Sequence, residues 1–135
     1  MIQVIMGLKG SGKTKKLVDS IHEAVLSTKG DVVCIEYGQK LTYDIPYCVR
    51  LVDSKEYAIA NSDMLKGLLS GLHAGNFDIT NVYIDNLYKT IGNDRAAGEE
   101  FVAWCDRFAA ANDMNITITI SDDPALASDA IKQYL

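Results

Sequence analysis

One stretch near the N-terminus combines glycine, lysine and hydroxyl residues in a spacing that suits a bound anion. It runs from Gly7 to Thr14 with the sequence GLKGSGKT. Glycines let the backbone turn so that several N–H groups point at one anion, at φ values that other residues resist. A lysine at the end of such a turn supplies positive charge, and the adjacent hydroxyl is a ligand for a divalent cation. These residues therefore predict a site for phosphate groups and a metal ion.

The residues on either side of this stretch predict the elements that hold it. Ile2–Met6 is a short apolar run typical of a buried strand, and from Lys13 onward apolar residues recur at helical spacing. A turn between a strand and a helix offers the anion the first N–H groups of the helix and the positive end of its dipole. The pattern G-x-x-x-x-G-K-[ST] in this setting is that of a Walker A motif, and Gly10 adds a third glycine to it.

A second candidate is an aspartate that follows another apolar run. The sequence Val82-Tyr83-Ile84 leads directly into Asp85, which resembles a Walker B strand and its acid. Such an acid holds Mg²⁺ through water at the carboxyl end of a neighbouring strand. The next residue is Asn86, where many ATP-hydrolysing proteins have a glutamate that polarises the attacking water. Because an amide orients water but cannot take its proton, Asn86 indicates slow hydrolysis.

Together these motifs resemble those of the P-loop NTPase superfamily, in particular its RecA-like members. The chain also resembles small single-domain bacterial proteins labelled twitching-motility-type ATPases and, more weakly, the core of thymidine kinases. The resemblance implies ATP and Mg²⁺ as cofactors, with Thr14 and Asp85 at the metal. It implies that the nucleotide contacts Gly7, Lys9, Gly10, Ser11, Gly12, Lys13 and Thr14. It places Lys13 and Glu36 in catalysis, and Asn86 is a further catalytic candidate because it stands where many members have the glutamate that polarises water.

Three residues, Glu36 among them, have two interpretations on the sequence alone. Glu36 closes the run Val32–Ile35, where RecA-like proteins place a catalytic glutamate, but a solvated acid at a strand end gives the same pattern. Ser121 resembles a polar sensor residue or simply begins a turn. Arg95 either reaches a γ-phosphate, in its own chain or in a neighbour, or is a solvated loop arginine.

Short apolar runs alternate with longer helical patterns along the chain, which predicts an α/β fold. We expect a three-layer αβα sandwich, residues 1–135 as one P-loop domain, and a mainly parallel sheet of four or five strands. The expected strands are Ile2–Met6, Val32–Ile35, Cys48–Val52, Asn81–Ile84 and Ile116–Ile120. Ile2–Met6 is expected at an exposed edge of the sheet, whereas Cys48–Val52 suits either a core or an edge position.

Capping and turn signals predict the helices. The first begins at Lys13 and ends at Gly30 in a left-handed cap. A capping box formed by Asp53 and Glu56 predicts a helix that breaks near Asn61 and restarts after Ser62 to reach Ala74. The remaining expectations are a loop over Gly38–Tyr47, a mobile loop over residues 90–98, a helix over Glu99–Ala111, and a last helix capped by Asp123 with Pro124 in its first turn.

Length and charge exclude several classes of protein. The chain has 135 residues and a formal charge of −5, so non-specific nucleic-acid binding is not expected. Four lysines nevertheless lie within eight residues around the glycine-rich stretch, which favours a small anionic ligand: Lys9, Lys13, Lys15 and Lys16. The three cysteines form no CxxC pair, and no signal or membrane-spanning segment is evident, so we expect a cytoplasmic protein.

The function predicted from these observations is ATP and Mg²⁺ binding with slow or partner-activated hydrolysis. A protein partner or a homo-oligomer would then accelerate ATP hydrolysis. One alternative is a non-enzymatic nucleotide switch or assembly subunit, which Asn86 favours. Another is a small-molecule, nucleoside-like kinase, although the chain holds only three arginines with which to build a lid.

Overall fold

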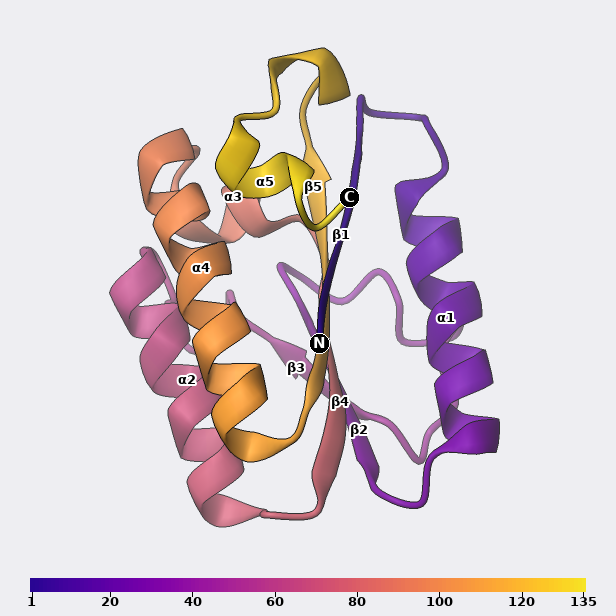
Figure 1. Cartoon of the computed structure of the whole chain (residues 1–135). Coiled ribbons are helices and arrows are strands. Elements are labelled where there is room, and N and C mark those ends of the chain that lie inside the picture. The colour runs from indigo at the N-terminus through magenta and orange to yellow at the C-terminus, as the bar shows by residue number, and fades with distance from the viewer.

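The computed structural model describes all 135 residues and contains one five-stranded sheet (Figure 1). The strand order is β1-β5-β4-β2-β3, and every neighbouring pair is parallel. The strands are β1 (Ile2–Gly7), β2 (Asp31–Glu36), β3 (Arg50–Asp53), β4 (Ile79–Ile84) and β5 (Asn115–Ser121). The predicted α/β class and the parallel sheet are therefore confirmed, and β3 is an edge strand.

The helices lie on both faces of the sheet, as the sandwich prediction requires. In Figure 1, α1 stands alone on one side, whereas α2 and α4 stand together on the other. The helices are α1 (Lys13–Ser27), α2 (Ser62–Gly75), α3 (Leu87–Ile91), α4 (Arg95–Asn112) and α5 (Asp129–Lys132), with a 3₁₀ turn, η1, at Pro124–Leu126. None of them is long and apolar enough to cross a membrane.

An irregular segment, residues 37–49, completes the layer that α1 begins. It contains turns but no helix or strand, which confirms the predicted loop over Gly38–Tyr47. Its side chains Leu41, Ile45 and Val49 are buried and join α1 in a small apolar core. A larger core lies on the opposite face and includes Phe101 of α4 and Leu65 of α2.

The helix expected from the capping box at Asp53 does not form. Asp53 instead accepts hydrogen bonds from the N–H groups of Gly38 (2.8 Å) and Lys55 (2.9 Å) through Oδ1. Asp53 thus links the loops after β2 and β3 by hydrogen bonds. The contact with Gly38 is between residues distant in sequence, so the spacing of Asp53 and Glu56 could not predict it. The helix begins at Ser62, and Asn61 caps it by accepting from Met64 N–H (2.9 Å).

Two further boundary predictions are wrong. Residues 90–98 are largely helical, because α3 runs to Ile91 and α4 already begins at Arg95, with Asp94 accepting from Ala97 N–H (3.1 Å) as its cap. Gly30 is absent from the residues with positive φ, and α1 ends at Ser27, followed by Thr28 in extended conformation. Gly30 is small for another reason, since a Cβ there would overlap the side chain of Thr80.

Both ends of the chain meet at the outer edge of β1. The predicted edge position of this strand is confirmed, and Val4 N–H donates to the carbonyl of Tyr134 (2.8 Å), which covers part of that edge. The predicted last helix is divided in two. Asp123 caps only the 3₁₀ turn by accepting from Ala125 N–H (2.9 Å), and α5 follows separately.

Candidate functional site

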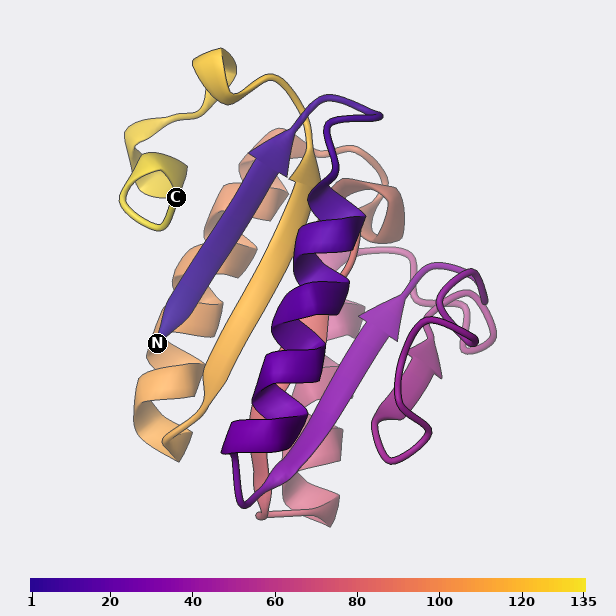
Figure 2. The same cartoon turned by 90° about the vertical axis from the view of Figure 1, so that its right-hand side faces the viewer.

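The parallel sheet brings the carboxyl ends of all five strands to one edge. Figure 2 shows the turn after β1 and the first residues of α1 at the same end of the molecule as the ends of β5 and β2. The sequence candidates Asp85 and Glu36 follow or end β4 and β2, so they lie at this edge too. Open α/β sheets bind ligands at this edge, in crevices between loops that leave toward opposite faces.

The Gly7–Thr14 loop has a backbone that only its glycines permit without strain. Gly10 and Gly12 have φ values of 85° and 87°, in the left-handed region that favours glycine. At Gly7 the constraint is space, because a Cβ there would overlap Oγ of Ser11 unless that side chain moved. The N–H of Ser11 donates to the carbonyl of Leu8 (3.0 Å), which closes the turn just before α1.

Lys13 is the first residue of α1, and its side chain folds back along the loop. It is buried, and its Nζ donates to the carbonyl of Leu8 (3.2 Å). The ammonium group is therefore held beside the loop backbone, with no carboxylate neutralising it. Thr14 is exposed in the first turn of α1, and a groove of about 350 Å³ beside it is also lined by Lys15, Val18 and Asp44.

Asp85 is fixed by the two strands that flank β4. Its N–H donates to the carbonyl of Ile35 in β2 (2.9 Å), and its Oδ1 accepts a hydrogen bond from the hydroxyl of Thr119 in β5 (2.7 Å). The same hydroxyl accepts from the N–H of Asn86 (2.7 Å), a residue with φ of 57°. Sequence reasoning missed Thr119, because the alternation of Ile116–Ile120 indicated only a strand.

Glu36 is buried at the end of β2, and both of its carboxylate oxygens are engaged. Oε1 accepts from Lys40 N–H (3.0 Å) and Oε2 from Leu41 N–H (3.0 Å). Burial raises the pKa of this carboxyl group, with smaller contributions from Asp85 and Asp53, while the two backbone donors act in the opposite direction. Within the chain, Glu36 thus holds segment 37–49; its predicted catalytic role stays a prediction.

Arg95 is tied to the carboxyl end of β5. Its guanidinium group pairs with both carboxylate oxygens of Asp122, Nε to Oδ2 at 2.7 Å and Nη2 to Oδ1 at 2.9 Å. The N–H of Asp122 in turn donates to the carbonyl of Gly7 (3.1 Å), at the start of the glycine-rich loop. Arg95 is thus the first residue of α4 and not a loop residue, but its side chain is exposed, as the solvated alternative expects, and a contact with a γ-phosphate stays a prediction. Ser121 is exposed and pairs in register with Gly7.

Thr14 and Asp85 are the residues at this edge whose chemistry suits a magnesium ion bound together with phosphate. No group of three or more His, Cys, Asp or Glu side chains is placed to hold a metal by itself. Magnesium in phosphate sites, however, uses one or two protein oxygens and keeps phosphate and water as its other ligands. Thr14 offers an exposed hydroxyl, and Asp85 has one carboxylate oxygen, Oδ2, to which no group of the chain donates.

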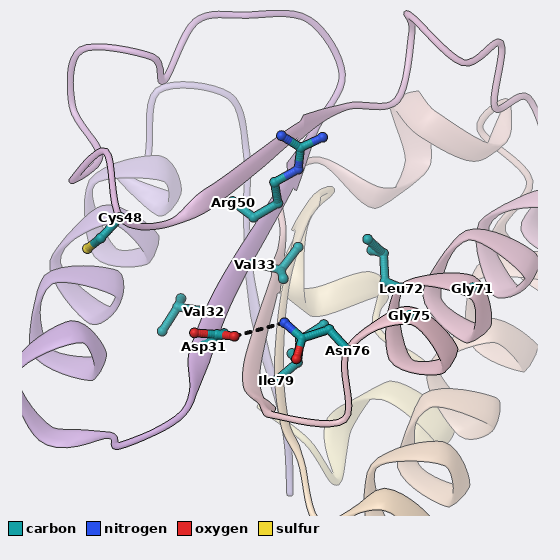
Figure 3. Close-up of a pocket in the computed structure, with 10 residues that line it drawn as sticks. All are labelled: Asp31, Val32, Val33, Cys48, Arg50, Gly71, Leu72, Gly75, Asn76 and Ile79. Carbon is teal, nitrogen blue, oxygen red and sulfur yellow. Dashed lines mark hydrogen bonds between the residues drawn. The ribbon is translucent and has the colours of Figure 1, made fainter.

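The structure also contains a groove at the opposite end of the sheet, where sequence reasoning predicted nothing. Figure 3 shows it between the first residues of β2 and the last turn of α2, with Asn76 donating to the carboxylate of Asp31 (2.8 Å). Gly71 and Gly75 leave space on α2, and the groove encloses about 500 Å³. It is remote from the Gly7–Thr14 loop, because it lies at the amino ends of the strands.

Comparison with known proteins gives no relative from which a function could be transferred. No protein-family model matches the chain, and no curated protein matches it. A functional assignment therefore depends on the glycine-rich loop, the residues after β4 and the sheet that brings them to one edge.

Proposed function

We propose that this chain binds ATP and Mg²⁺ as a P-loop NTPase with slow intrinsic hydrolysis. The observation that carries the proposal is the left-handed backbone of Gly10 and Gly12 between a parallel strand and the helix that begins at Lys13. A turn of this kind directs backbone N–H groups and the positive helix end toward phosphate. Asp85 at the same edge supports the metal half of the proposal.

Each residue then has a defined part. The loop backbone binds the phosphates, and Lys13 exchanges its bond to Leu8 for one to the β- and γ-phosphates. Thr14 and Asp85 would hold the metal, the second through water. When bound, Mg²⁺ neutralises charge that develops on the phosphate oxygens during transfer.

Slow hydrolysis is expected because the other candidate residues are not free to act as a general base or to stabilise the transferred phosphate. Asn86 cannot accept a proton from water, both oxygens of Glu36 are engaged by segment 37–49, and Arg95 is paired with Asp122. A general base and a free arginine are the groups that speed phosphoryl transfer to water. A protein partner, or another copy of the chain, would supply these groups or release them.

The direct test removes the lysine and the hydroxyl in turn. We expect Lys13→Ala to lower the affinity for ATP at least about tenfold, which is about 1.4 kcal/mol, because a buried positive charge no longer meets the phosphates. Thr14→Ala should lose most of the increase in ATP affinity that Mg²⁺ gives. Isothermal titration calorimetry with and without Mg²⁺ measures both effects.

The matched control for this test is Lys29→Ala, which removes the same charge from an exposed position beyond the end of α1. It should bind ATP as the unaltered chain does. Unchanged ATP affinity in both Lys13→Ala and Thr14→Ala would contradict the proposal.

A nucleotide switch is the second candidate, favoured by the engagement of both Glu36 oxygens within the chain. In that case the protein binds ATP tightly and releases almost no phosphate, and the bound nucleotide alters segment 37–49 beside Thr14. Phosphate release without any acceptor, measured over many turnovers, separates the two candidates, because only an ATPase accumulates inorganic phosphate.

A further inference from the structure

Thr119 occupies a position from which one hydroxyl group reaches both residues that follow β4. β5 lies beside β4 in the sheet, and Ile118 pairs in register with Ile84. Thr119 therefore stands level with Asp85, and its side chain is fully buried. Its hydroxyl lies 2.7 Å from Asp85 Oδ1 and 2.7 Å from the backbone nitrogen of Asn86.

The direction of these two hydrogen bonds is fixed by the number of protons. A threonine hydroxyl has one proton to donate, and a backbone N–H can only donate. Asn86 therefore donates to the hydroxyl, and the hydroxyl donates its proton to Asp85. This orientation occupies Oδ1 of Asp85 from inside the sheet and leaves Oδ2 without a donor from the chain.

The same hydroxyl also stabilises the backbone at Asn86. This residue has φ of 57°, a conformation that costs a non-glycine residue free energy and persists where the surroundings hold it. The turn after β4 is held from β2 by the bond between Asp85 N–H and Ile35 and from β5 by Thr119. Thr117, on the same face of β5 and also buried, makes no such contact with Asp85 or Asn86.

From this geometry we infer that Thr119 is a positioning residue for the cation-binding carboxylate, acting by holding Asp85 with one oxygen presented to the metal. The inference rests on the proposed function, because it assigns Asp85 to Mg²⁺. It adds a residue that neither motif contains, and it predicts that a single buried hydroxyl controls how strongly Mg²⁺ assists ATP binding.

The experiment compares ATP affinity with Mg²⁺ and with EDTA in variants of similar size. Thr119→Val keeps the volume but removes the hydroxyl, so we expect the Mg²⁺-dependent gain in affinity to fall about tenfold while binding in EDTA stays unchanged. Thr119→Ser restores the hydroxyl and should recover the gain. Thr117→Val makes the same substitution two residues earlier and should behave as the unaltered chain does.

A second measurement reads the apo protein directly. In ¹H–¹⁵N spectra without nucleotide, the Asn86 amide should shift and exchange faster in Thr119→Val but not in Thr119→Ser or Thr117→Val. Where Thr119→Val fails to fold, Thr119→Cys retains a side chain of similar size with only a weak donor and is expected to show the same loss.

The outcomes separate this inference from the proposed function. A folded Thr119→Val protein with a normal Mg²⁺-dependent gain would overturn the inference alone. An equal loss in Thr117→Val would also overturn it, because the effect would then come from general packing of β5. No binding of ATP by the unaltered chain, with or without Mg²⁺, would overturn the proposed function and this inference with it.

Discussion

Asp85 and Glu36 stand at the ends of neighbouring strands and follow the same kind of apolar run, yet the structure uses them in opposite ways. Both oxygens of Glu36 accept backbone N–H groups of segment 37–49. Asp85 accepts one hydrogen bond from Thr119 and has Oδ2 free of donors from the chain. The difference teaches that an acid at a strand end is available to a ligand only where the adjoining loop does not engage both of its oxygens.

The largest effect that this comparison predicts is on stability. Glu36→Ala leaves the N–H groups of Lys40 and Leu41 without their acceptor, the second at a buried and the first at a partly buried position, and a buried unsatisfied donor costs about 1–3 kcal/mol. We expect the free energy of unfolding to fall by about 3 kcal/mol in urea denaturation. Asp85→Ala should cost clearly less, and an equal loss in the two variants would remove the distinction between the two acids.

A smaller effect is expected on ligand binding, where substitution of Asp85 should matter more than substitution of Glu36. Asp85→Asn keeps an oxygen that can accept from Thr119 but removes the negative charge that the proposed function assigns to Mg²⁺. We therefore expect near-normal stability and a loss of about tenfold in ATP affinity that appears only with Mg²⁺, measured by calorimetry. Glu36→Gln, as the counterpart, should retain its Mg²⁺ response, and a matching loss there would contradict the contrast.

The smallest effect concerns pH and belongs to Glu36 alone. Burial raises the pKa of this carboxyl group in the folded chain above its ordinary value, so the folded state binds the proton more readily than the unfolded state. Stability linked to Glu36 is therefore greatest below the ordinary pKa and is lost as pH rises through the raised one.

Urea denaturation across the mildly acidic range provides the measurement. Glu36→Gln has no carboxyl group to titrate, so the difference in unfolding free energy between it and the unaltered chain should move in favour of Gln as pH rises through that window. A difference that is flat with pH would argue against a raised pKa at Glu36.

The parts of the fold that depend on local pattern could be predicted from the sequence. The buried strands were recognisable as runs rich in β-branched residues. The glycine-rich turn was recognisable as a motif because its own backbone conformation requires glycine at Gly10 and Gly12, independently of tertiary contacts. The edge position of β1 is confirmed, but its prediction came from the resemblance to RecA-like sheets and not from the residues of the strand.

The missed features all depend on contacts between distant segments. Asp53 looked like a helix cap, but its oxygen serves Gly38 as well as Lys55. The role of Thr119 depends on the alignment of β5 with β4, and that of Glu36 on the path of a loop without periodic pattern. Gly30 was expected to have a special φ, although what it provides is room for Thr80.

Segment 37–49 has a consequence for engineering the chain. It covers one face of the sheet through three buried anchors, Leu41, Ile45 and Val49, while Tyr43 and Tyr47 between them are fully exposed. A helix in the same place would fix the position of every residue relative to the next, whereas the turns between these anchors do not. The entropic cost of closing a loop also grows only slowly with its length. Insertions at the exposed tyrosines should therefore leave the three anchors in place and cost little stability.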